Sequence, residues 1–307
     1  MQLNIVYNDD CLNVLNDNVK IEDESVQLIF ADPPYNLSGN GLKLLGNKTG
    51  GDYYMVNEDW DKMEEKEYFD FTNEWIKASK RVLKPNGSIF ICCSYHNIGE
   101  CMLGLKNNGF EVKNIITWQK TNAMPNLTRR VLTHSTEFII WAVKGKNWIF
   151  NYEVLKELNP EKTKDGKSKQ MRDVWQIPLC QGKERLKDEN GKALHPTQKP
   201  EELLKRIILG FSHEFDTILD PFAGSGTTPF IAKKYNRNYI AIEKEKKYFE
   251  AMKKRLENLK KEKSLFDIDD YQNFNYDFDK EHLQAFTNMS IENIEEWKKD
   301  KKCLAKN

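Results

Sequence analysis

The sequence predicts an α/β protein in which helices cover both faces of a sheet. Over most of the chain, apolar runs of strand length alternate with stretches whose apolar residues recur at helical spacing. A buried run over 26–31 leads directly into the tetrapeptide Asp32-Pro33-Pro34-Tyr35. A second short strand, over 217–219, leads into a glycine-containing turn at 220–228 that opens a helix. Turns of this kind, at the ends of strands, are where α/β proteins bind ligands.

Composition sets the outer limits. With 307 residues, 39% hydrophobic and 31% charged, the chain is long enough for one large domain and an appendage. No apolar run approaches the roughly 20 residues that cross a bilayer, so no membrane contact is expected. The six cysteines form no C-x-x-C pair, which predicts reduced thiols, a cytoplasmic location and no metal.

The net charge is zero but is unevenly distributed. From Ser264 onward there are ten acidic residues and six lysines, so the rest of the chain carries a net charge of +4. A mildly basic body with an acidic tail permits a nucleic-acid partner without requiring one.

The first half of the chain is expected to alternate strands and helices. A short strand is predicted over 3–7, and Asp10-Cys11-Leu12 opens a small helix. After the strand that ends before Asp32, a helix is predicted over 66–83, which Pro85-Asn86-Gly87 should stop. Further strands are predicted over 88–94, 112–119 and 137–143.

Residues 145–194 are polar, with isolated aromatic side chains. A sequence-reading insert and a long surface excursion would both have this composition. Pro200 then begins an amphipathic helix. The last expected elements are the strand over 217–219, a helix through Tyr235 and a strand over 238–242.

The tetrapeptide Asp32-Pro33-Pro34-Tyr35 presents a carboxylate, a rigid elbow and an aromatic ring at the end of a strand. Two prolines fix φ and supply no N–H, so their carbonyl groups can face a ligand. This arrangement suits a planar ring that carries an amino group. An ordinary turn at the end of a strand is the alternative.

The turn at 220–228 predicts a nucleoside site. Its glycines allow close approach of the backbone to a ligand, and the helix that follows offers free N–H groups. Glu243 follows the next strand, about twenty residues on, where an acidic residue can bind ribose hydroxyls. Asp10, with Cys11 behind it, follows the first strand and either reaches the ligand or caps the small helix.

The two turns together resemble the paired motifs of DNA amino methyltransferases that use S-adenosylmethionine, in the order of the β group. The segment 194–200, Leu-His-Pro-Thr-Gln-Lys-Pro, also resembles that group. The resemblance implies a Rossmann-like methyltransferase fold with a mixed seven-stranded sheet. It implies a catalytic domain over 1–262 with a target-recognition insert at about 145–194, and it leaves 263–307 unexplained. The cofactor-binding residues it implies are Asp10, Cys11, His195, Thr197, Lys199, Asp220, Phe222, Ala223, Gly224, Ser225, Gly226, Thr227 and Glu243.

Two further stretches, 117–126 and 133–137, resemble the DpnA-type adenine methyltransferases, which modify GATC and tolerate single-stranded DNA. The expected DNA contacts, suited to phosphates and base edges, are Asn36, Lys120, Asn122, Asn126, Arg129 and Arg130. A solvated loop is the alternative for this basic cluster. The resemblance leaves open a homodimer and a restriction endonuclease that acts on the same site.

The expected reaction is direct methyl transfer to the N6 amine of a flipped-out adenine, without a covalent intermediate. Asp32 and the Pro33 carbonyl would each accept one N–H, and Tyr35 would stack on the base. No cysteine nucleophile is required, so Cys92 and Cys93 are interpreted as strand packing. The alternatives are N4-cytosine methylation, an RNA or protein-glutamine substrate, and an inactive DNA-binding subunit.

Overall fold

A mixed sheet of eight strands forms the centre of the computed structural model, which describes residues 1–36, 43–44, 53–54, 62–126 and 129–259. The tail over 263–307, which the resemblance leaves unexplained, lies outside these residues. All neighbouring strands are parallel except where β7 pairs with β5 and β6. The order is β1 (Ile5–Tyr7), β10 (Asn238–Ile242), β9 (Thr217–Asp220), β2 (Val26–Ala31), β5 (Leu83–Cys93), β7 (Thr136–Val143), β6 (Glu111–Gln119) and β8 (Val174–Gln176). A separate antiparallel pair joins β3 (Lys43–Leu44) and β4 (Tyr53–Tyr54).

The expected count of seven strands was wrong by one. The additional strand is β8, which lies in the polar region over 145–194 and extends the sheet beyond β6. Two hydrogen bonds to β6 hold its two ends. The Thr117 N–H donates to the Asp173 carbonyl (2.7 Å), and the Ile177 N–H donates to the Gln119 carbonyl (3.1 Å). Only Trp175 of its three residues is buried. A three-residue strand with one buried side chain leaves too short a pattern to predict.

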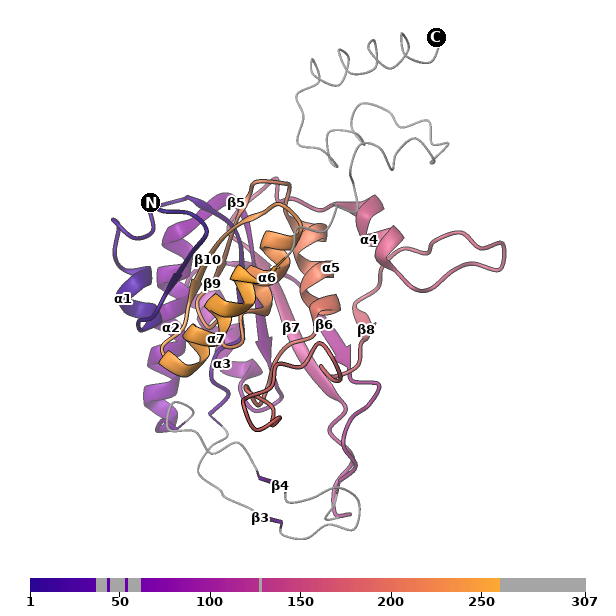
Figure 1. The fold of residues 1–307 in the computed structure, drawn as a ribbon. Coiled ribbons are helices and arrows are strands. Elements are labelled where there is room, and N and C mark those ends of the chain that lie inside the picture. Colours follow the sequence, from indigo (N-terminus) through magenta and orange to yellow (C-terminus); the bar gives the residue numbers. More distant parts are fainter. Residues whose placement is uncertain (37–42, 45–52, 55–61, 127–128, 260–307) are drawn as a thin grey trace, which may run out of the picture.

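Helices cover both faces of the sheet, as predicted (Figure 1). One face packs α1 (Cys11–Leu15), α2 (Glu65–Val82) and α3 (Ile98–Asn107). The other packs α4 (Tyr152–Leu158), α5 (Glu201–Phe211), α6 (Thr227–Lys234) and α7 (Lys246–Glu257). Strand β2 contributes Leu28 and Phe30 to the second core and Ile29 to the first. This alternation is the period-two pattern of a strand buried on both faces.

The boundary between α2 and β5 lies earlier than predicted. The helix ends at Val82, and the strand begins at Leu83 and runs through Pro85-Asn86-Gly87. Leu83 pairs with Val26 of β2, so the sheet starts before the residues that were expected to stop the helix. No helix in the described part of the chain is both long and apolar enough to cross a membrane.

The region over 145–194 is not only a surface excursion. Val154 and Leu155 of α4, and Trp175 of β8, are buried in the same core as the helices that follow. The Asn151 side chain donates to the carbonyls of Leu209 (2.7 Å) and Ser212 (3.0 Å), which fixes the start of α4 against the end of α5. Part of this region is therefore framework.

The sheet topology brings the ends of several strands to one edge. The parallel strands β1, β10, β9, β2 and β5 all end there, and the antiparallel strand β7 begins there. In open α/β sheets, ligands bind outside this edge. The two predicted turns, separated by almost two hundred residues of sequence, therefore lie side by side in space.

Candidate active site

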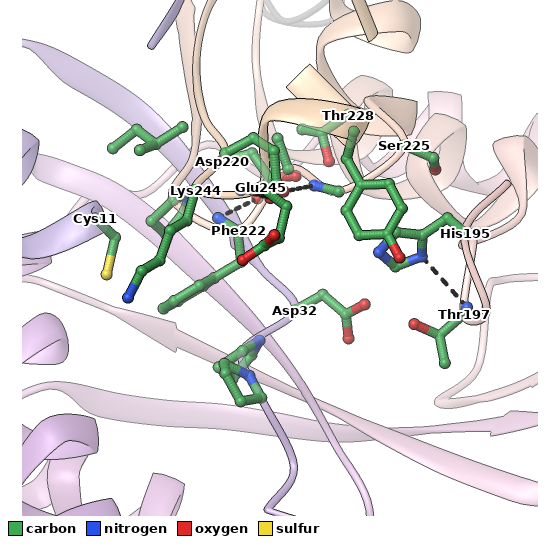
Figure 2. Close-up of a pocket in the computed structure, with 18 of the residues that line it drawn as sticks. Cys11, Asp32, His195, Thr197, Asp220, Phe222, Ser225, Thr228, Lys244 and Glu245 are labelled. Carbon is green, nitrogen blue, oxygen red and sulfur yellow. Dashed lines mark hydrogen bonds between the residues drawn. The ribbon is translucent and has the colours of Figure 1, made fainter. Parts of the chain in front are cut away.

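A cavity of about 340 Å³ opens at this edge of the sheet. It is lined by all four residues of the tetrapeptide at 32–35 and by every predicted cofactor residue except Gly226. Figure 2 shows the Asp32 carboxylate pointing into the same space that Phe222 and His195 line. One cavity thus holds both predicted half-sites, and its volume lies in the range of small-molecule sites.

The turn between β9 and α6 is built around two left-handed glycines. Gly224 has φ +49°, and its N–H donates to Glu243 Oε2 at 2.7 Å. Glu243 Oε1 accepts the Glu245 N–H at 2.7 Å, so the carboxylate is held from two sides. Gly226 has φ +76°, and a Cβ there would collide with the Met252 side chain. Gly226 therefore shapes the turn from behind instead of lining the cavity.

Other side chains close the cofactor half of the cavity. Phe222 packs edge-on against Trp75, with ring centroids 5.3 Å apart. Asp220 Oδ1 accepts the Phe222 N–H at 2.9 Å, which holds the turn at the end of β9. The buried Ser225 and Thr227 and the small Ala223 complete this wall.

The segment that contains His195 lies across the turn. A Cβ on Gly224 would stand 2.9 Å from His195 Nε2, so the absence of a side chain permits this close approach. His195 Nδ1 accepts the Thr197 N–H at 3.3 Å, as Figure 2 shows. Burial and nearby cations lower the pKa of His195 to about 3, so the imidazole is neutral near pH 7. A neutral, braced ring agrees with a cofactor contact.

Asp10 caps the helix α1, which was one of the two roles predicted for it; the other was contact with the ligand. Its Oδ1 accepts the Leu12 N–H at 3.0 Å, and Oδ2 lies 3.3 Å from Lys244 Nζ. Asp10 and Cys11 also line the cavity beside Glu243. The two readings are therefore compatible.

In the acceptor half of the cavity, Asp32 is already paired. Its Oδ2 accepts Lys199 Nζ at 2.5 Å, and its Oδ1 accepts the Tyr35 hydroxyl at 3.0 Å. The Pro34 carbonyl accepts the Tyr68 hydroxyl at 2.8 Å, which fixes the proline elbow. Lys199 belongs to the segment that was predicted to bind the cofactor, so one side chain joins the two half-sites.

Glu137, at the start of β7, is a site residue that the sequence predictions missed. Its Oε1 lies 2.6 Å from Lys120 Nζ, and its Oε2 lies 3.8 Å from Lys199 Nζ and 3.3 Å from the Tyr35 hydroxyl. Knowing that β7 runs antiparallel would have placed Glu137 at this edge. Lys120 was expected to contact DNA, but its ammonium group faces Glu137 with only 14% of the side chain exposed.

The pKa values of this group reflect burial and charge together. Burial raises the pKa of Asp32 more than Lys199 lowers it. Burial would also raise the pKa of Glu137, but the ammonium groups of Lys199 and Lys120 outweigh it and lower that pKa. Burial would lower the pKa of Lys199, but Asp32 and Glu137 outweigh it and raise that pKa. Lys199 is therefore a cation that lies between the carboxyl groups of Asp32 and Glu137.

The remaining residues predicted to contact DNA are divided between two settings. Arg129 and Arg130 are exposed, as a phosphate contact requires. Asn122 exchanges hydrogen bonds with the backbone of Leu179 (2.7 and 3.4 Å). Asn36 does the same with the backbone of Met63 (2.8 and 3.0 Å), and the Asn126 N–H donates to Thr133 Oγ1 at 3.4 Å. These asparagines brace loops, and their contact with DNA stays a prediction.

Cys92 and Cys93 are fully buried in β5, and burial raises the pKa of both thiols. They pack on opposite faces of the sheet, in agreement with the structural interpretation. Among the residues that the structure describes, no group of three or more His, Cys, Asp or Glu side chains could hold a metal ion.

The architecture and this cavity define a class of enzyme, and comparison with known proteins identifies the family. The model of the family described as DNA methylase matches residues 26–254, so the chain belongs to the DNA methylase family. It is 47% identical over 242 residues to the Type II methyltransferase M2.LlaDCHI of Lactococcus lactis subsp. cremoris, a match that covers 77% of this chain and 84% of the relative. It is also 47% identical over 243 residues to the Type II methyltransferase M2.DpnII of Streptococcus pneumoniae, which covers 78% and 85%.

Solved structures agree with this assignment. The complex of M1.HpyAVI with SAM, S-adenosylmethionine, is similar with a TM-score of 0.59 and 33% identity over 83% of this chain and 98% of that one. The PvuII DNA methyltransferase (cytosine-N4-specific) has a TM-score of 0.60 at 20% identity over 84% and 88% of the chains, which concerns the fold. The chain is thus a site-specific DNA methyltransferase that uses S-adenosylmethionine.

The residues of the cavity fit this cofactor. The Glu243 carboxylate faces the cavity and has lone pairs beyond those that accept the two backbone N–H groups. Gly224 and the His195 ring that packs over it both line the cavity, so a ligand there would meet this turn and the imidazole together. Several acidic side chains, among them Asp32, Asp220 and Glu243, line a cavity that must receive a positively charged sulfonium.

Proposed function

We propose that this enzyme methylates the exocyclic N6 amine of an adenine that has been flipped out of DNA. The observation that carries this proposal is the Asp32 carboxylate, which opens into the same cavity as the cofactor turn. S-adenosylmethionine supplies an electrophilic methyl group on a sulfonium. The acceptor half must then supply an amine with an available lone pair.

An exocyclic amine on an aromatic ring is a poor nucleophile, because its lone pair is delocalised into the ring. Asp32 and the Pro33 carbonyl, each accepting one N–H, would favour a pyramidal nitrogen with its lone pair directed at the methyl group. A carboxylate beside the nitrogen also stabilises the positive charge that develops during transfer. Alignment of the two partners lowers the barrier further.

Adenine is favoured over cytosine by Asp at the first position of the tetrapeptide, through the resemblance to the adenine enzymes. GATC is proposed as the target from the likeness of 117–126 and 133–137 to the DpnA type.

The region over 145–194 is proposed to carry part of the target recognition, alongside the framework residues that it contributes to the core. Arg129 and Arg130 are proposed to contact phosphates, because both are exposed cations. Lys120 is not, because Glu137 holds its ammonium group.

The expected partners beyond DNA remain proposals. The similar relatives are named Type II methyltransferases, which favours a restriction endonuclease that acts on the same site. A homodimer is expected to give a mass of twice 36.1 kDa by light scattering, and a mass of one chain at all concentrations would exclude it. We also propose single-stranded DNA as a substrate. A cytoplasmic location is proposed because the enzyme must reach DNA.

The test is transfer of labelled methyl groups to adenine-containing DNA by the native protein and by Asp32→Ala. Loss of the carboxylate should lower the transfer rate by about 10²–10³-fold or more. Cofactor affinity, measured by calorimetry, should stay within about twofold, because Glu243 and the turn at 220–228 are untouched. Glu111→Ala is the control, because this side chain is 67% exposed and lies at the start of β6, at the opposite edge of the sheet from the cavity. Transfer by Asp32→Ala at the native rate would overturn the proposal.

A further inference from the structure

The Asp32 carboxylate is already engaged on the side where the target amine would bind. Both of its oxygens are engaged, one by Lys199 at 2.5 Å and the other by the Tyr35 hydroxyl at 3.0 Å. The side chains of Asp32 and Lys199 are only 17% and 8% exposed, so bulk water screens this pair weakly. An incoming amino group must therefore share this carboxylate with two groups that are already bound to it.

Charge decides which of these two groups is incompatible with the reaction. Methyl transfer would place positive charge on an amine bound to Asp32, and the ammonium group of Lys199 already lies 2.5 Å from the same carboxylate. Two cations within a few Å of each other in a buried site repel strongly. Tyr35, which is neutral, carries no such penalty. Lys199 therefore has to move away from Asp32, but a buried ammonium group without a partner is costly.

Glu137 offers that partner within a short distance. Its Oε2 already lies 3.8 Å from Lys199 Nζ, so a small rotation of the lysine side chain would convert a long contact into a close pair. Glu137 is itself fixed by Lys120 at 2.6 Å and by the Tyr35 hydroxyl at 3.3 Å. The backbone of Lys199 stays anchored, because its carbonyl accepts Thr227 Oγ1 at 3.2 Å.

We propose that Glu137 is a positioning residue that takes Lys199 from Asp32 when the target amine arrives. The inference rests on the proposed function, because it assigns Asp32 to the amine. Glu137 does not touch the substrate in this account. It sets the availability of Asp32 by giving the displaced cation a second carboxylate.

The test compares the native enzyme with Glu137→Gln, which keeps the shape and removes the charge. The first substrate is an unmethylated DNA duplex that contains the sequence recognised by the native enzyme. A second duplex has purine, which lacks the amino group, in place of the target adenine. In Glu137→Gln, the single-turnover rate on the adenine duplex should fall at least about tenfold. The affinity of this variant for the adenine duplex should fall. Its affinity for the purine duplex should stay within about twofold of native, because purine has no amino group that could bind Asp32.

Two variants control for other effects. Glu137→Asp keeps the carboxylate and should retain most of the native rate. Glu24→Gln removes a carboxylate that pairs with Lys144 at 2.9 Å, at the opposite edge of the sheet, and should leave the rate unchanged. Equal loss of affinity for both duplexes in Glu137→Gln would show a merely structural role and overturn the inference. A native rate in that variant would overturn it as well.

A measurement on the native protein covers the case in which the variants fail to fold. In a crystal structure with the adenine duplex and demethylated cofactor, Lys199 Nζ should lie within hydrogen-bond distance of Glu137 and away from Asp32. Lys199 still paired with Asp32 beside the bound amine would refute the inference. These results are separate from the proposed function, because inactivity of the native enzyme on every DNA would refute that function first.

Discussion

Burial controls the chemistry of individual carboxyl groups at this site. Asp220 is buried at the end of β9, and burial raises its pKa to about 7. The pKa values of Asp32 and Glu243 are raised for the same first reason. A carboxyl group whose pKa is higher in the folded chain binds its proton more tightly there. It therefore couples stability to pH.

Asp220→Asn should remove one pH-dependent contribution to stability. In the native protein, the contribution of Asp220 is fully present below about pH 4 and is lost as the pH rises through about 7, because only the unfolded chain releases the proton readily in that range. The amide oxygen of Asn can still accept the Phe222 N–H. Urea unfolding of both proteins from pH 4.5 to 8 should show the native free energy of unfolding fall by about 2–4 kcal/mol relative to the variant. Parallel curves would contradict this account.

The site shows which residues a sequence discloses. Asp32 and Glu243 follow recognisable strands directly, so their place at the edge of the sheet where the cavity opens was predictable. Glu137 was not, because its role depends on the direction of β7 and on meeting Lys199, sixty-two positions along the chain. Lys120 was assigned to DNA from its charge alone, whereas a long-range partner fixes its direction.

At the scale of elements, the turn between β9 and α6 carries the tightest geometry. Both of its glycines have a left-handed backbone conformation, and both also lack a side chain where a neighbour packs closely. That neighbour is His195 for Gly224 and Met252 of α7 for Gly226. The cost of the left-handed conformation and the cost of a steric collision can be measured separately. Gly191 serves as the comparison, because it has φ +74° and no atom within 4 Å of a new Cβ.

Gly226→Ala should cost more stability than Gly191→Ala. Both changes place a side chain in the left-handed region, at a cost of about 1–2 kcal/mol. Only Gly226→Ala also collides with a buried neighbour, Met252, which adds about 1–3 kcal/mol. Urea unfolding measures the difference, and calorimetry should show weaker cofactor binding only in Gly226→Ala. Equal losses in the two variants would show that space behind the turn is unimportant.

The elements themselves were predicted unevenly, for a physical reason. The strand over 26–31 and the helix over 65–82 carry long apolar patterns, and the sequence located them within about a residue. The start of β5 and all of β8 were missed. Both depend on pairing with a neighbouring strand, Leu83 with Val26 and Trp175 with Trp118, which a local pattern does not reveal.

At the scale of the whole molecule, residues before 260 build both cores and the cavity. Among the residues that the structure describes, which end at 259, the two hydrophobic clusters and the cavity lining run from Met1 to Leu256. The match to the DNA methylase family ends at 254. The catalytic domain is therefore proposed to need nothing from the tail over 263–307.

A chain that ends at residue 262 should fold and bind S-adenosylmethionine with native affinity within about threefold, because every lining residue of the cavity is retained. Its thermal midpoint should shift by less than about 4 °C, the change that roughly 1 kcal/mol would cause in a domain of this size. Calorimetry and thermal unfolding check both values. Loss of cofactor binding in a folded truncated chain would show that the tail belongs to the site.

We expect this enzyme to methylate adenine at one DNA sequence, with the target amine bound by Asp32. The most direct measurement is sequencing, with detection of modified bases, of DNA from a host that lacks its own methylation and expresses the native chain. N6-methyladenine at a single sequence, GATC in our proposal, and its absence with Asp32→Ala, is the predicted result. Methylated cytosine, or no methylated base in DNA from cells that contain the folded native protein, would contradict the claim.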